Sequence, residues 1–153
     1  NIHSGILLYS SSNNTITGNT YTYNNYGIYL FTSSSNNTVT GNICNNNSNS
    51  GILLAASSNN TVTGNTCIRG TGTPNEDYTT EYTILLSGAD NNYNLISFNN
   101  CMGKKVEVEG GRGNSVWGNK FDGTSDLPWA EITNDFPVFG EGNEPDLAEG
   151  DKE

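Results

Sequence analysis

The stretch Asn13-Asn14-Thr15-Ile16-Thr17-Gly18-Asn19-Thr20 occurs three times at a constant interval, and this repetition decides the fold. It returns almost unchanged at residues 36–43 and 59–66, each copy 23 residues after the one before. A second phrase lies between these copies and reads Gly-Ile-x-Leu in its clearest versions. The second phrase begins at Gly5, Gly27, Gly51, Thr83 and Lys105, and weaker copies of the first phrase begin at Asn94 and Asn114.

Both phrases alternate with a period of two, which is typical of a strand with one buried face. Strands this short cannot enclose a core alone, but successive copies can stack as rungs about 4.8 Å apart. Parallel crossovers are usually right-handed, so we predict an all-β, right-handed, single-stranded parallel β-helix of about five rungs. The side chains expected to point inward are Ile6, Ile28, Ile52, Ile84 and Val106; Leu8, Leu30, Leu54, Leu86 and Val108; and Ile16, Val39, Val62, Ile96 and Val116.

The repeats divide the chain into regions. They occupy residues 1–121, with an insertion at about 69–82 that we expect to leave the stack as a loop. Residues 122–139 carry enough apolar side chains to form a C-terminal cap over open strand edges. Residues 140–153 are nearly devoid of apolar side chains and are predicted to be an acidic disordered tail. No comparable cap precedes Ile6, which predicts missing rungs upstream or end-to-end association through the first rung.

Composition excludes several functions. The chain has 153 residues and a net charge of −10, with 16 acidic and six basic side chains, which argues against nucleic acid as a partner. No run of 18 apolar residues is present, so a membrane-spanning helix is not expected. His3 is the single histidine, which argues against a Ser-His-Asp catalytic system. The 26 asparagines disfavour a helical domain, because Asn competes with the backbone in helix interiors.

Two columns of equivalent residues have structural explanations. The first contains Asn19, Asn42, Asn65, Asn99 and Asn119, where amide side chains are expected to bond from rung to rung. The second contains Cys44, Cys67 and Cys101, with Tyr21 and Phe121 at its ends. Cysteine behaves as a small hydrophobe in such a setting, so core thiols are favoured over a disulfide or a metal site.

The phrase Ser-Ser-Asn-Asn-Thr-Val-Thr-Gly-Asn, followed by Gly-Ile-x-Leu, resembles the repeats of the NosD-like, pectate-lyase-like parallel β-helix superfamily. The resemblance covers roughly residues 2–121. It implies an extracellular, cell-surface or periplasmic protein of the carbohydrate-binding and sugar-hydrolase type, as in archaeal and bacterial surface proteins. Because the matching residues are packing and turn residues, the resemblance implies the fold more strongly than the function.

The resemblance also implies a copper-enzyme maturation role as a distant alternative. Copper favours soft ligands, and this chain offers His3, Met102 and the cysteine column. Met102 follows Cys101 directly, so strand alternation places the two side chains on opposite faces. We therefore expect no copper site from these residues.

A polysaccharide lyase or glycoside hydrolase is the alternative enzymatic hypothesis. Such sites need carboxylates and a basic side chain on one face of the helix. The sequence favours a non-catalytic role, because the same charges suit a solvated strand face. The candidates are Glu107, Glu109, Lys105, Arg112 and Asp77.

The favoured hypothesis is an extracytoplasmic module that acts as a cell-surface scaffold or as a polysaccharide-binding domain, with a polysaccharide or cell-surface glycan as its partner. Residues 21–31 are rich in aromatic side chains, and Tyr29 is expected to form an exposed stripe with Leu53 and Leu85. Aromatic faces beside hydrogen-bonding side chains are what a sugar site requires. The predicted sugar-binding residues are Tyr29, Tyr78, Tyr82, Arg69 and Glu81. No cofactor is required, and Asp122 and Asp126 resemble a calcium loop only faintly.

Overall fold

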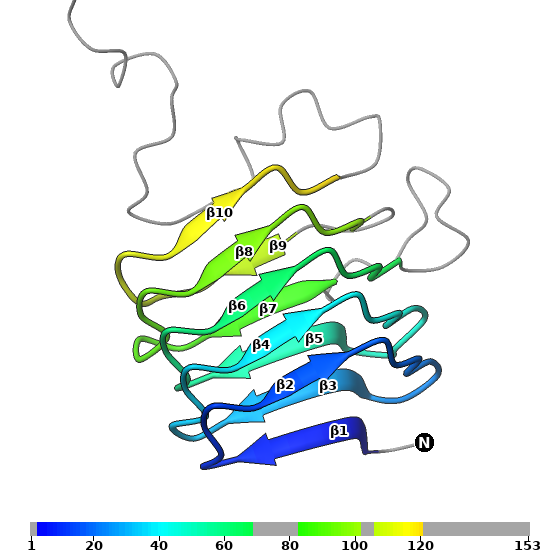
Figure 1. Cartoon of the computed structure of the whole chain (residues 1–153), viewed down its shortest axis with the longest axis horizontal. Helices are drawn as coiled ribbons and strands as arrows, with labels where there is room; N and C mark the ends of the chain where they lie inside the picture. The colour runs from blue at the N-terminus through cyan, green and yellow to red at the C-terminus, as the bar shows by residue number, and fades with distance from the viewer. Residues whose placement is uncertain (1–2, 69–82, 102–105, 121–153) are drawn as a thin grey trace, which may run out of the picture.

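Residues 3–68, 83–101 and 106–120 are described by the computed structural model, and in these ranges the chain forms ten strands and no helix. The strands alternate along the chain between two five-stranded parallel sheets (Figure 1). Sheet A contains, in spatial order, β1 (Ser4–Tyr9), β3 (Tyr26–Phe31), β5 (Ser50–Ala55), β7 (Ile84–Ser87) and β9 (Val106–Val108). Sheet B contains β2 (Thr15–Thr17), β4 (Thr38–Thr40), β6 (Thr61–Thr63), β8 (Leu95–Ser97) and β10 (Ser115–Trp117). The predicted parallel β-helix is thus confirmed.

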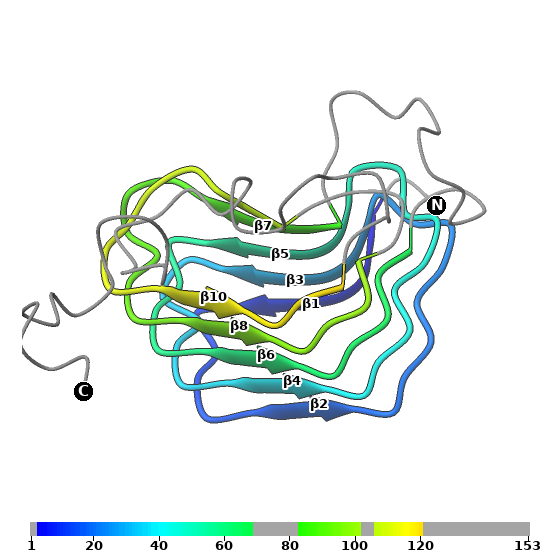
Figure 2. The same cartoon turned by 90° about the horizontal axis from the view of Figure 1, so that it is seen from above.

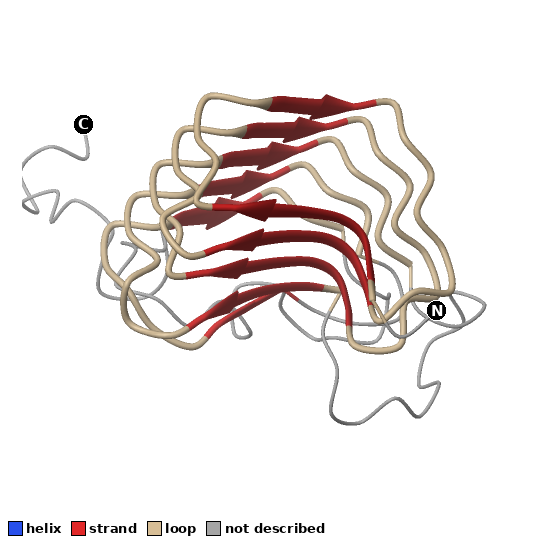
Figure 3. Cartoon of the chain, turned by 90° about the horizontal axis from the view of Figure 1, so that it is seen from below, coloured by secondary structure: helices blue, strands red, loops and turns tan. Residues whose placement is uncertain are grey.

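The two sheets face each other across the stack. Viewed from above, the strands of sheet B run one way along one side and those of sheet A return along the other (Figure 2). Because the chain rises toward the viewer from β1 to β10 while it turns counter-clockwise, the helix is right-handed (Figures 1 and 2). The opposite view shows the loops that join the sheets following similar paths from rung to rung (Figure 3).

The core lies between the sheets and consists of the predicted aliphatic columns. In sheet B, Ile16 pairs with Val39, and Val39 with Val62, so that identical positions stack directly over one another. Burial of these side chains removes apolar surface from water, which is the main favourable contribution to folding. All the predicted inward side chains are buried except Ile6, which is half-buried at the first rung.

Two asparagine ladders border sheet B. The predicted ladder, from Asn19 to Asn119, follows the strands, and a second ladder precedes them, formed by Asn14, Asn37, Asn60, Asn94 and Asn114. Within both ladders, an amide oxygen accepts bonds from the backbone and side-chain N–H groups of the rung before; for Asn65 these come from Asn42, both at 3.0 Å. The Asn65 amide group also donates to the Val39 carbonyl at 2.9 Å. The ladders therefore satisfy buried turn groups that would otherwise lack partners.

Several predicted regions lie outside the described residues. These are the insertion at 69–82, the cap at 122–139 and the tail at 140–153, and their assignment stays a prediction. In the described part of the chain, no helix has the length and apolar character needed to cross a bilayer.

Candidate functional site

Four aromatic rings form a continuous row on the outer face of sheet A. Tyr26 and Tyr29 have ring centroids 5.0 Å apart, Tyr29 and Phe31 5.2 Å, and Phe31 and Tyr9 5.6 Å. The row arises because strand alternation turns Tyr29 and Phe31 outward, while the register pairs Phe31 with Tyr9 of the preceding strand. We call these four residues the aromatic platform. Aromatic pairs at such distances stabilise one another, so the rings hold a defined arrangement.

A hollow of about 380 Å³ lies beside the platform. Tyr26 and Tyr29 form one side, and the remaining lining residues are His3, Ser4, Leu7 and Asn25. The Tyr26 hydroxyl accepts a hydrogen bond from the Asn49 amide at 3.2 Å. Burial raises the pKa of the Tyr29 hydroxyl, and neighbouring Tyr26 adds to the rise, so Tyr29 remains a neutral donor at ordinary pH. The site therefore combines ring faces with uncharged hydrogen-bonding groups.

The predicted exposed stripe does not continue along sheet A as expected. Leu53 follows Tyr29 in the ladder but is only 5% exposed, and Leu85 is half-buried. The expectation for Leu53 was wrong because alternation fixes the direction of a side chain, not what covers it. Leu53 pairs with Tyr29 on one side and Leu85 on the other, and parallel neighbours about 4.8 Å apart shield each other.

The platform belongs to an uncharged part of the chain. Arg69 is the first Asp, Glu, Lys or Arg in the sequence, so β1 to β6 carry none of these side chains. An acidic or basic ligand would find no opposite charge on these strands. A neutral ligand needs no opposite charge, so the absence of charged side chains does not weaken its binding.

The predicted catalytic residues lie elsewhere. Glu107 is half-buried in β9 and pairs with Leu85, whereas Glu109 is exposed and accepts a hydrogen bond from the Ser87 hydroxyl at 2.6 Å. Arg112 is exposed and lines a separate hollow of about 430 Å³ that also includes Asp90. Lys105 and Asp77 lie outside the described residues, so the catalytic assignment stays a prediction.

Most predicted ligand-binding residues also fall outside the described ranges. Among the sugar-binding candidates, Tyr29 is described, and the structure places it at the centre of the platform. Tyr78, Tyr82, Arg69 and Glu81 are not described, and neither are the calcium candidates Asp122 and Asp126. Sequence reasoning missed Tyr9, although its position in the second phrase is equivalent to that of Phe31.

The cysteine column lies in the core, as predicted. Cys44, Cys67 and Cys101 are free and buried. The cysteines lie at a corner of the β-helix, where Cys44 and Cys67 pack closely against glycines of the second phrase. A Cβ on Gly27 would lie 2.9 Å from the Cβ of Cys44, so glycine is needed at position 27. A hydrogen bond with Cys44 and burial raise the pKa of Cys67, and burial raises the pKa of Cys101 to about 12. The three cysteines are therefore packing residues, and the thiols of Cys67 and Cys101 stay protonated.

Comparison with known proteins identifies the family. Residues 1–134 match the family model described as "Periplasmic copper-binding protein (NosD)". No curated protein matches the chain, and no solved structure does. Because the match covers most of the chain, this protein belongs to the NosD family, and its β-helix is that of a family described as periplasmic.

The described residues do not fit the copper site that the family description suggests. Met102 lies outside the described residues, which leaves His3 and the three cysteines as candidate copper ligands, and the raised pKa values of Cys67 and Cys101 oppose the deprotonation that a thiolate ligand needs. His3 is exposed and lines the hollow beside Tyr26 and Tyr29, whereas the three cysteines are buried in the core. Within the described ranges, no group of three or more His, Cys, Asp or Glu side chains is placed to hold a metal.

Proposed function

We propose that this member of the NosD family is an extracytoplasmic scaffold that binds an uncharged polysaccharide on its aromatic platform. The observation that carries the proposal is the row of four rings on β1 and β3, in the part of the chain where β1 to β6 carry no Asp, Glu, Lys or Arg. We propose the periplasm or the cell surface as its place of action, in keeping with the description of the family.

The chemistry of the platform suits sugars. One face of a pyranose ring presents C–H groups and can stack on an aromatic ring, while its hydroxyls need hydrogen-bond partners at the edge. Tyr29 supplies the central ring, and Asn25 and Ser4 in the adjacent hollow supply edge groups. The Asn49–Tyr26 hydrogen bond further restrains one end of the row.

The arrangement of the platform favours binding of a polysaccharide over binding of a single sugar. The rings come from two adjacent strands, β1 and β3, whose register is fixed by parallel pairing over five residue pairs. Successive sugars can contact successive rings, so weak contacts add within one ligand. Because the rings are already packed against each other, binding orders few additional side chains.

Affinity electrophoresis and calorimetry with polysaccharides test this proposal. We expect neutral glucans or mannans to retard the protein, and acidic alginate or polygalacturonate to retard it less. Replacing Tyr29 with Ala removes the central ring and should weaken binding about tenfold, the loss of roughly 1.4 kcal/mol. The matched control is Tyr23→Ala, an equivalent truncation of an exposed tyrosine that belongs neither to the platform nor to the hollow.

The products of the same incubations separate binding from catalysis. Retardation without new reducing or unsaturated ends is the expected result. New ends that disappear on replacing Glu107 would support the lyase or hydrolase alternative instead. Equal binding by the Tyr29→Ala and Tyr23→Ala variants would contradict the platform as the site.

A further inference from the structure

One residue breaks the pattern at the end of the sheet B strands. The position after each strand has a left-handed backbone and is occupied by Gly18, Gly41, Gly64 and Gly118, with φ between 63° and 68°. In the fourth rung the same position is Phe98, with φ 55°. Glycine adopts this conformation freely, whereas a bulky side chain is strained by it.

Burial does not offset this strain. Phe98 is 58% exposed, and its ring partner Trp117 in β10 is 42% exposed. A strained residue that served the core would be expected to bury its side chain. Tyr23 and Tyr93 are also exposed at positive φ, so the feature that distinguishes Phe98 is its contact with a second exposed ring, that of Trp117.

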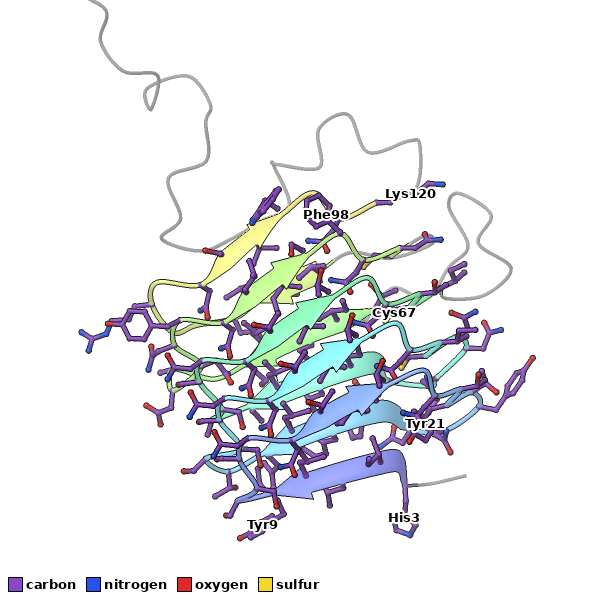
Figure 4. All side chains as sticks on the ribbon, viewed as in Figure 1. His3, Tyr9, Tyr21, Cys67, Phe98 and Lys120 are labelled. Carbon is purple, nitrogen blue, oxygen red and sulfur yellow. The ribbon has the colours of Figure 1, made fainter. Side chains whose placement is uncertain are left out.

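The rings of Phe98 and Trp117 pack edge to face, and we call this pair the aromatic corner. Their centroids lie 4.5 Å apart with the planes at 73°, so one ring stands edge-on to the other. The next rung leaves room for them, because a Cβ on Gly118 would lie 2.9 Å from the Phe98 ring. Figure 4 shows Phe98 near the last rung, at the opposite end of the stack from Tyr9 and His3.

Hydroxyl groups lead up to this corner. Trp117 ends a column on the outer face of sheet B that begins with Thr17 and Thr40 and continues through Thr63 and Ser97. Ser97 is only 2% exposed and its hydroxyl donates to Thr63 at 3.4 Å, so the hydroxyls of this column that a ligand can reach are those of the threonines. A ring pair at the end of a row of hydroxyls offers both contacts that a sugar needs.

We infer that Phe98 and Trp117 form a second sugar-stacking site for the same class of neutral polysaccharide. This inference rests on the proposed function and adds a contact at the other end of the stack, on the other sheet. Two separate contacts on one scaffold raise the avidity for a long polysaccharide without raising the affinity of either site for a short one.

Substitution of Phe98 by Gly tests the inference, because it restores the residue found in the other rungs. We expect neutral polysaccharide to bind about tenfold more weakly, since one ring contact is lost. The melting temperature should stay unchanged or rise by about 2–4 °C, because the left-handed strain is relieved. Trp117→Ala should weaken binding similarly. Tyr93→Asn is the matched control, since it also replaces an exposed aromatic at positive φ by the residue that Asn13, Asn36 and Asn59 provide in other rungs.

The outcomes are distinct. Weaker binding by Phe98→Gly without a loss of thermal stability supports the second site, provided that Tyr93→Asn binds normally. Unchanged binding contradicts it, and so does a lower melting temperature, because Phe98 would then serve the fold. If the unmodified protein binds no polysaccharide, the proposed function fails. If Tyr29→Ala weakens binding and Phe98→Gly does not, the second site alone fails.

Discussion

The outer faces of sheets A and B belong to the same β-helix but differ in how far their side chains follow the repeat. In sheet B, the outward positions of β2, β4 and β6 are all threonine. In sheet A, the outward column changes at nearly every rung, from Leu7 to Tyr29, Leu53, Leu85 and Glu107. The inner columns are aliphatic in both. The inside of the stack therefore specifies the register, and the proposed binding residues lie where the outside departs from the repeat.

The largest effect should come from placing a charged side chain at an inward position of a strand, compared with the outward position next to it. Val62→Asp places an unpaired charge in the core of sheet B and should destabilise the fold by more than about 4 kcal/mol, enough to prevent folding. Thr61→Asp, one residue away but outward, should cost less than about 1 kcal/mol. Urea denaturation measures both. Comparable losses from the two changes would show that the register is misassigned.

The asparagine ladders should contribute the next largest effect. Asn65→Ala removes the acceptor of the buried Asn42 backbone N–H, one of three acceptors of the Asn42 side-chain amide and the donor to the Val39 carbonyl, and should cost about 2–4 kcal/mol. Asn14→Ala is the control, because Asn14 is exposed at the first rung, and it should cost about 1 kcal/mol. A similar cost at both positions in chemical denaturation would argue that the ladder is not a source of stability.

A smaller effect concerns pH. The pKa of Cys101 is raised by burial to about 12, whereas an unfolded cysteine titrates near 9, so the unfolded state releases its proton first. The stability from the protonated thiol is complete below pH 9 and decreases as the pH rises toward 12, by up to about 1.4 kcal/mol per unit. Cys101→Ala should have a shallower decline in unfolding free energy across this range. Parallel pH profiles for the two proteins would refute the assignment.

Much of the fold was predictable because the spacing of the repeats indicates which residues pair in neighbouring strands. Equal spacing aligned Ile16 with Val39 and Val62, and alignment on the Gly-Asn phrase placed the cysteines in one buried column. The ladder through Asn65 was predicted, whereas the ladder through Asn60 was missed despite the same spacing.

The candidate site was less predictable, because it depends on neighbours that alternation does not specify. Tyr29 was identified from its outward position, but its contact with Phe31, and that of Phe31 with Tyr9, required the packing of two strands. Leu53 was misjudged because neighbouring side chains cover it. The strain at Phe98 is a backbone property that only the structure reveals.

Mapping a bound neutral oligosaccharide by NMR tests the central claim most directly, since it reports which face of the stack meets the ligand. We predict that the largest chemical-shift changes occur in β1 and β3, at the ring signals of Tyr9, Tyr26, Tyr29 and Phe31, with smaller changes at Phe98 and Trp117. The threonines of β2 should shift little. Largest changes at the β2 threonines, or around Glu107, would contradict the account.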